Sequence, residues 1–142
     1  MLLFPLFKAV RAGRRVVGTR RRPGAGDLQQ ALNTLARSAR PRARRLDTDL
    51  RWLRLCWRLS GGAARPVRDE ALFLTAALLT LGHDAAVVVG RRTAPTAAAD
   101  YLYWVTVDGV VVSTGIPVEE LYTPVASLPQ AQPVSETSTT GV

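Results

Sequence analysis

Apolar and polar residues alternate at helical spacing in the first third of the chain. Between Leu28 and Arg40 the apolar positions fall three and four residues apart, which predicts an amphipathic helix. Asp27 is expected to be its N-cap, and Pro41 limits the helix at the other end. The preceding stretch, Arg20–Gly26, joins repelling charges to Pro and Gly and is predicted to be a loop.

A second helix is predicted from Asp47 or Thr48, either of which can cap it, to Leu59, because Ser60–Gly62 stops it. This helix has two apolar stripes. One consists of Leu46, Leu50, Leu53 and Trp57, and the other of Trp52, Leu55 and Leu59. A helix with two apolar stripes is more than half buried, either in its own core or under a partner.

The third helix is almost wholly apolar. Asp69 and Glu70 open it, where the helix dipole favours negative charge, and Gly82 ends it. Its body, ALFLTAALLTL, is apolar on all sides. We therefore expect it to be the central, buried helix of the fold.

Strand patterns follow the third helix. Ala85–Gly90 is a short β-branched run, and Tyr101–Val107 is a second strand. Asp108-Gly109 is a strong hairpin signal, with Val110–Ser113 as the returning strand. Helices followed by a small antiparallel sheet predict an α+β domain.

The pattern divides the chain into three parts. Residues 1–26 form an apolar and arginine-rich N-terminal segment, and residues 27–129 form the helical and sheet domain. The tail, residues 130–142, lacks apolar periodicity and is expected to be disordered.

Charge is distributed unevenly. Residues 1–68 hold 17 of the 19 basic side chains but only three of the 11 acidic ones, so a cationic front precedes an acidic back. The opening MLLFPLFKAV is apolar yet too short to span a bilayer. Joined to the following arginines, residues 1–22 could lie on an anionic lipid surface, or form a helix that docks on its own domain or on a partner. A nucleic-acid partner is less favoured, because no recognition motif accompanies the arginines.

The reactive side chains are few. With one cysteine, Cys56, and one histidine, His83, the chain offers neither an internal disulfide nor a Cys/His zinc site, and we expect a cytoplasmic protein without metal or cofactor. The alternative is a peptidase in which Cys56 is the nucleophile and His83 its base. Cys56 lies between apolar residues, where a thiol is usually inert packing, and His83 follows a helix end, where it tends to cap carbonyls.

Three runs of the sequence carry a resemblance: VRDEALFLTAALLTLGHDAAVVVG, AADYLYWVTVDGVVVS and ELYTPVASLP. They resemble the transglutaminase-like leader peptidases of lasso-peptide biosynthesis, the small B-type proteins, over about residues 63–129. The resemblance implies a helix, a strand, a hairpin and a closing Tyr-Thr-Pro segment. The matching positions are Leu72, Gly82, Gly90, Trp104, Val105, Val107, Asp108, Gly109, Tyr122, Thr123 and Pro124.

The resemblance does not extend to the catalytic residues of that family. Val67 stands at the position of the nucleophilic cysteine, Leu102 at that of the histidine, and Ser113 or Thr114 at that of the acidic residue. A thiolate attack needs an imidazole to take its proton and a carboxylate to orient that imidazole. The resemblance therefore implies a degenerate domain without its triad, and whether it is an enzyme is left open.

Such a domain is expected to be a non-proteolytic subunit of a ribosomal-peptide maturation complex. It would bind the precursor peptide, a larger enzyme partner, or both, and linaridin pathways, which dehydrate and epimerise Ser and Thr, are the setting that this resembles. The residues expected to bind partner or peptide are Trp52, Trp57, Arg51, Arg54, Arg58 and Trp104. The polar groups nearest the lost site in sequence are Asp69, Glu70, Asp100 and Tyr101. The rivals are the Cys56 peptidase and a basic module that binds membranes at the inner face or nucleic acid.

Overall fold

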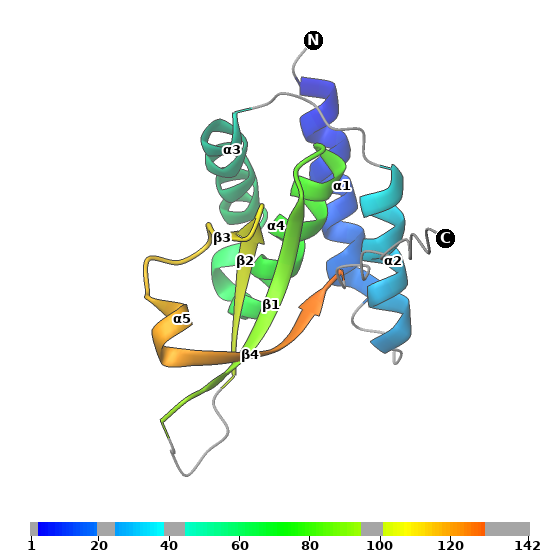
Figure 1. Ribbon diagram of the computed structural model, residues 1–142. Helices are drawn as coiled ribbons and strands as arrows, with labels where there is room; N and C mark the ends of the chain where they lie inside the picture. Colours follow the sequence, from blue (N-terminus) through cyan, green and yellow to red (C-terminus); the bar gives the residue numbers. More distant parts are fainter. Residues whose placement is uncertain (1–2, 20–24, 39–44, 95–100, 130–142) are drawn as a thin grey trace, which may run out of the picture.

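The computed structural model describes residues 3–19, 25–38, 45–94 and 101–129 and has the predicted α+β architecture (Figure 1). The helices are α1 (Leu3–Thr19), α2 (Ala25–Ser38), α3 (Leu46–Leu59), a 3-10 turn η1 (Gly62–Ala64), α4 (Val67–Thr80) and α5 (Val118–Leu121). The strands are β1 (Ala85–Arg92), β2 (Tyr101–Val107), β3 (Val110–Val111) and β4 (Tyr122–Leu128). The expected disorder of residues 130–142 falls outside the described residues.

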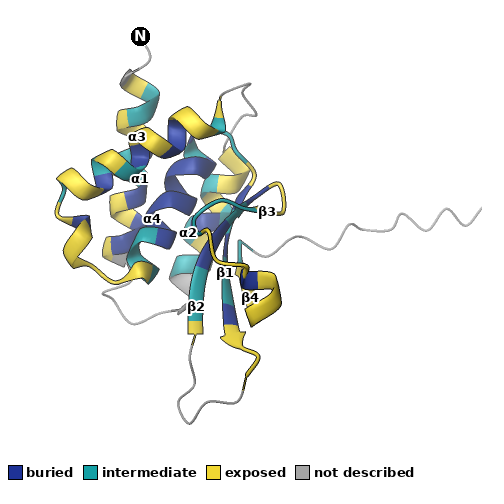
Figure 2. Ribbon diagram, turned by 90° about the vertical axis from the view of Figure 1, so that its left-hand side faces the viewer, coloured by how far each residue is buried: buried dark blue, intermediate teal, exposed yellow. Residues whose placement is uncertain are grey.

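Helix α4 is the centre of the fold, as its apolar sequence predicts. Every residue from Ala71 to Leu79 is buried (Figure 2). The helix ends in a Schellman motif, in which the backbone amide of His83 donates to the Leu78 carbonyl and that of Gly82 to the Leu79 carbonyl. Gly82 adopts φ 93°, which a side chain would disfavour, so the predicted stop at this glycine is confirmed.

Helix α1 packs directly on α4 and belongs to the main core. Ala9, Val16 and Val17 are buried on one face of the helix. The two helices approach each other closely at Gly13, where an added Cβ would lie 2.6 Å from Cδ2 of Phe73. Of the alternatives open for the N-terminal segment, the structure therefore shows a helix docked on its own domain. Residues 3–19 share one core with the helices and strands that follow.

Three predicted helix starts are wrong. Helix α4 begins at Val67, two residues before the predicted Asp69. Helix α2 begins at Ala25, so Asp27 lies inside it and the predicted Arg20–Gly26 loop ends earlier. Helix α3 begins at Leu46 with Arg45 at the N-cap, so Asp47 and its neighbour Thr48 lie in the first turn. An acidic residue anywhere in the first turn interacts favourably with the helix dipole. Its presence therefore indicates which turn begins the helix, but it does not identify the N-cap residue.

The sheet is antiparallel, with the strand order β3-β2-β1-β4. Strand β2 has the predicted bounds, β1 runs on to Arg92, and β3 stops at Val111, two residues short of the predicted Ser113. Asp108 and Gly109 have φ 51° and 79°, the backbone of a tight hairpin turn, which confirms that prediction. Strand β4 begins at Tyr122-Thr123-Pro124 and pairs with β1 at the edge of the sheet.

Candidate functional site

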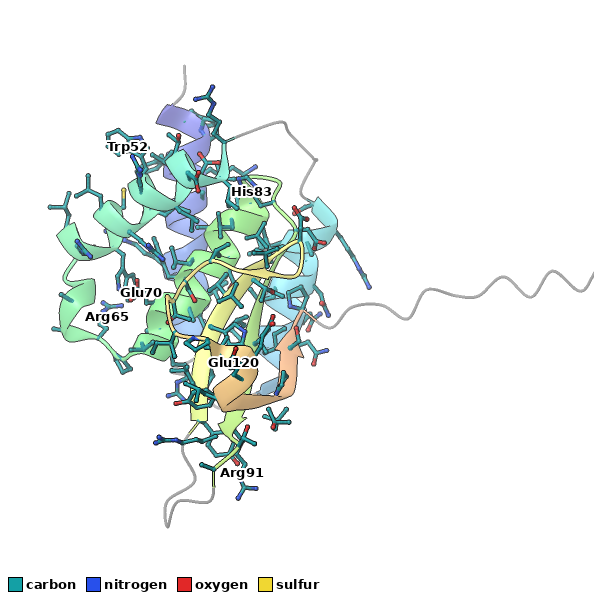
Figure 3. The ribbon with its side chains drawn as sticks, turned by 60° about the vertical axis from the view of Figure 1, so that its left-hand side comes forward. Trp52, Arg65, Glu70, His83, Arg91 and Glu120 are labelled. Atoms are coloured by element: carbon teal, nitrogen blue, oxygen red, sulfur yellow. The ribbon has the colours of Figure 1, made fainter. Side chains whose placement is uncertain are left out.

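The outward face of α3 presents a row of apolar side chains. Trp52, Leu55 and Leu59 are 51%, 45% and 80% exposed, and they follow one another at spacings of three and four residues. Figure 3 shows Trp52 on the outer side of the helix. We call Trp52, Leu55 and Leu59 the α3 stripe. The other predicted stripe faces the core, because Leu50, Leu53 and Trp57 are buried there.

Two arginines flank the α3 stripe. Arg51 and Arg58 are exposed, next in sequence to Trp52 and Leu59. Arg54 has a different role, because its Nη2 donates a hydrogen bond of 3.0 Å to the Val112 carbonyl and joins α3 to the segment after β3. Of the three predicted contact arginines on this helix, Arg51 and Arg58 are thus the two presented to solvent.

Trp57 and Trp104, which were predicted together with Trp52 to bind partner or peptide, are buried in this structure. Trp57 is 4% exposed, its ring lies 4.9 Å from that of Phe73, and the Arg65 guanidinium lies 5.7 Å from the centroid of the Trp57 ring. Trp104 is 2% exposed and packs on Tyr122, with ring centroids 6.4 Å apart. Sequence alone could not separate the inward Trp57 from the outward Trp52, because both stripes of α3 are apolar.

The first two positions that the resemblance assigns to a triad, Val67 and Leu102, lie near the same end of the domain but do not face one another. Val67 is the first residue of α4 and is 63% exposed. The first turn of α4 reaches the start of β2, since the Arg68 guanidinium lies 5.8 Å from the centre of the Tyr103 ring. Side chains alternate along a strand, and Val105 belongs to the main core, so Tyr103 faces α4 and Leu102 points to the opposite face of the sheet.

The third position that the resemblance assigns, Ser113 or Thr114, holds a hydroxyl that is hydrogen-bonded to the backbone. Ser113 Oγ accepts a hydrogen bond of 2.8 Å from the Val105 amide, and Thr114 Oγ1 accepts one of 3.2 Å from the Ile116 amide. The Ser113 bond holds the segment that follows β3 against β2, whereas the Thr114 bond is local to that segment. Ser113 and Thr114 are therefore positioned as structural residues.

The fold brings together only some of the polar residues that were predicted to lie near the triad positions of the resemblance. Asp69 and Glu70 lie in the first turn of α4 and are half-buried, while Tyr101 is the first residue of β2 and is 50% exposed. Asp100 lies outside the described residues. The first-turn carboxylates are placed where they interact favourably with the helix dipole, which gives them a structural use.

His83 is paired with a residue that the sequence analysis did not single out. Its Nε2 donates a hydrogen bond of 2.9 Å to Oδ2 of Asp49 in α3, and both side chains are almost fully buried. A signal for this pair was present, because Asp49 falls on the inward stripe of α3, between Leu46 and Leu53. A carboxylate at a core position requires a buried partner. Cys56 is half-buried on the same helix.

Among residues 3–19, 25–38, 45–94 and 101–129, no three His, Cys, Asp or Glu side chains gather closely enough to hold a metal ion. Within the same ranges, no helix combines the length and apolar character needed to cross a bilayer. The chain matches no protein-family model, and the searches of curated proteins and of solved structures find no match either. The geometry of the described residues therefore carries the functional argument.

Proposed function

We propose that this protein is a non-proteolytic subunit of a ribosomal-peptide maturation complex, and that it binds a larger enzyme partner through the α3 stripe. The observation that carries the proposal is the exposure of Trp52, Leu55 and Leu59 on a helix whose other side builds the core. The proposal places the complex in the cytoplasm, in keeping with the single cysteine of the chain.

The composition of this face favours a protein partner. Tryptophan and arginine are the residues most enriched among those that dominate binding energy, and here Trp52 stands beside Arg51 while Arg58 stands beside Leu59. Burying a large apolar side chain contributes about 1.5–3 kcal/mol relative to leaving it exposed. Burial of three such side chains in one row would therefore supply a large share of the binding free energy of a modest interface.

The absence of proteolysis follows from the residues at the lost triad. Neither Val67 nor Leu102 has a group that can attack a carbonyl or take a proton. The one histidine is engaged by Asp49. Any chemistry on the precursor, with Ser and Thr dehydration and epimerisation of linaridin type as the proposed reaction, is therefore assigned to the partner enzyme.

The peptide-maturation setting rests on the resemblance of residues 63–129 to the B-type leader peptidases. Support comes from the order of the elements, because α4 is followed by β1, the β2–β3 hairpin and β4, which begins at Tyr122. The first turn of α4 also lies beside the start of β2, through Arg68 and Tyr103. These features agree with a domain that kept its scaffold and lost its catalytic residues.

The test is co-expression of the tagged chain with the products of its neighbouring genes, followed by pull-down and mass spectrometry of any precursor peptide. A stoichiometric large partner, and loss of water from the precursor only when both proteins are present, is the expected result. A chain that cleaves the precursor alone, or one that captures no partner, would contradict the proposal.

A matched pair of variants assigns the interface. Trp52→Ser combined with Leu55→Ser should lower partner recovery at least tenfold, because it removes two apolar anchors. Ile116→Ser is the control, since Ile116 is also 51% exposed but lies in the loop before α5. Equal recovery of the partner with both variants would show that the α3 stripe is not the interface.

A membrane-surface function is the second candidate, and one observation favours it. Phe4 and Phe7, near the start of α1, are 78% and 67% exposed, and Lys8 and Arg11 follow them on the helix. Exposed aromatic residues followed by cations are typical of helices that lie on anionic lipid. This function is compatible with a complex, because Phe4 and Phe7 are separate from the α3 stripe.

A further inference from the structure

A cavity of about 670 Å³ lies between α1 and α2, away from the α3 stripe. Figure 1 shows the two helices side by side along α4. The residues that line it are Lys8, Arg11, Ala12, Arg15, Val16, Gln30, Ala31, Thr34, Leu35 and Thr80. We call this cavity the α1–α2 groove. Its volume falls within the range of about 300–1,000 Å³ that ligand sites have.

One wall of the groove is cationic. Lys8, Arg11 and Arg15 follow one another on α1 at spacings of three and four residues, so they project from the same side over two helical turns, about 10 Å. Arg15 already makes a contact of its own, so the inference rests on the other two. Neither Lys8 nor Arg11 forms an ion pair with a described residue, and the described lining contains no acidic side chain.

The chemistry of the groove's floor and of its opposite wall indicates which class of ligand the groove could bind. The floor is apolar, formed mainly by Val16, Ala31 and Leu35. The opposite wall is polar, with the Gln30 amide and, one helical turn on, the Thr34 hydroxyl, which donates to the Gln30 backbone carbonyl and can still accept a hydrogen bond. An acyl chain needs apolar surroundings on all sides, whereas side-chain amides and hydroxyls pair well with peptide groups. A cationic rim, an apolar floor and a polar wall together suit a short amphipathic peptide with carboxylates.

We infer that the α1–α2 groove binds an acidic amphipathic peptide segment, whose carboxylates pair with Lys8 and Arg11 and whose apolar side chains pack on the floor. The precursor peptide is the source of this segment if the proposed function holds, so the inference depends on that function for its biological ligand. Laying an amphipathic helix into a groove between helices is a recurrent mode of peptide recognition.

The test uses a fluorescein-labelled synthetic peptide of about 15 residues, with glutamates one turn apart on one face and leucines on the adjacent face. Fluorescence anisotropy is measured with the full chain. The Lys8→Glu/Arg11→Glu variant should bind the peptide at least tenfold more weakly. Arg14→Glu is the matched control, because Arg14 is exposed on the same helix and lies outside the groove. Its affinity should stay within about twofold of the unmodified chain.

Two further measurements separate recognition of the carboxylates from loss of folding. A peptide with glutamine in place of glutamate should bind at least tenfold more weakly, and thermal unfolding of each variant shows whether it is folded. If the double variant does not fold, Lys8→Gln and Arg11→Gln measured singly replace it. Each should then weaken binding, and the effect should shrink as salt is added.

The inference is overturned if the unmodified chain does not bind the acidic peptide, or if it and the Lys8→Glu/Arg11→Glu variant bind it equally. Binding of a monomeric short-chain anionic phospholipid, with the same dependence on Lys8 and Arg11 and without peptide binding, would assign the groove to lipid instead. Partner capture distinguishes this failure from failure of the proposed function, because it depends on Trp52 and Leu55. If the groove does not bind the peptide but the partner is still captured, only the inference about the groove is overturned and the proposed function stands.

Discussion

His83 and Asp49 join the end of α4 to the first turns of α3 through a hydrogen bond of 2.9 Å between Nε2 and Oδ2. Both side chains are largely withdrawn from water, with exposed fractions of 10% and 6%. This hydrogen bond gives the single histidine of the chain a structural role.

Removing one partner of this pair should destabilise the fold. His83→Ala leaves the Asp49 carboxylate buried without its histidine donor, and we expect a loss of about 1–3 kcal/mol in the free energy of unfolding. Denaturant titration checks the value. Asp84→Ala, a change at an exposed acidic residue next in sequence to His83, is the control and should change stability by less than about 0.5 kcal/mol. A His83→Ala loss no larger than that of the control would show that the pair contributes little.

Gly13 fixes how closely α1 approaches α4. In Gly13→Ala the new Cβ would meet the Phe73 ring, so we expect a destabilisation of about 1–3 kcal/mol from overpacking. Gly18→Ala is matched to it, because Gly18 lies on the same helix with no atom within 4 Å of its added Cβ. That variant should instead gain up to about 1 kcal/mol from helix propensity. The two changes should therefore shift the unfolding midpoint in opposite directions, and a parallel shift would refute the packing argument.

Cys56 is expected to be dispensable for any processing of a precursor peptide. It is half-buried on α3, and the one imidazole of the chain is hydrogen-bonded to Asp49. Cys56→Ala should leave the mass of the processed peptide and its rate of formation unchanged in the co-expression experiment. A folded Cys56→Ala protein that no longer supports processing would restore the cysteine-peptidase interpretation.

Phe4 and Phe7 provide a test of the membrane-surface candidate. Phe4→Ser combined with Phe7→Ser should abolish sedimentation of the protein with vesicles that contain phosphatidylserine, because it removes the exposed aromatic side chains. Vesicles of phosphatidylcholine alone control for charge, and Val110→Ser, a change at a residue 65% exposed at the hairpin, controls for lost apolar surface. Equal sedimentation of both variants would remove α1 from consideration as a lipid contact.

The elements that could be predicted from sequence are those in which every residue favours the same local structure. Helix α4 is apolar throughout, and Asp108-Gly109 demands a turn, so both emerge from local pattern. Strand β4 could be expected only through the resemblance. Its residues from Thr123 to Ser127 are all exposed, and a strand with no buried face has no reason to alternate apolar and polar positions.

The candidate site was only partly predictable for a similar reason. The core face of α1 uses small residues at Ala9 and Gly13, which contribute little to an apolar pattern. Which stripe of α3 faces inward is decided by contacts with Phe73 and its neighbours, far along the chain. The α1–α2 groove likewise exists only after two separate helices meet on α4. Tertiary relationships of this kind have no local signature.

The central position of α4 has a consequence for how the chain folds. Its partners come from both sides in sequence, with α1 at the beginning of the chain and β1 and β2 after it. During synthesis, the apolar surface that the sheet later covers stays exposed until β2 has left the ribosome. Contacts between distant segments slow folding, and exposed apolar surface invites association. The nascent chain is therefore expected to require chaperone protection until β2 has paired with β1.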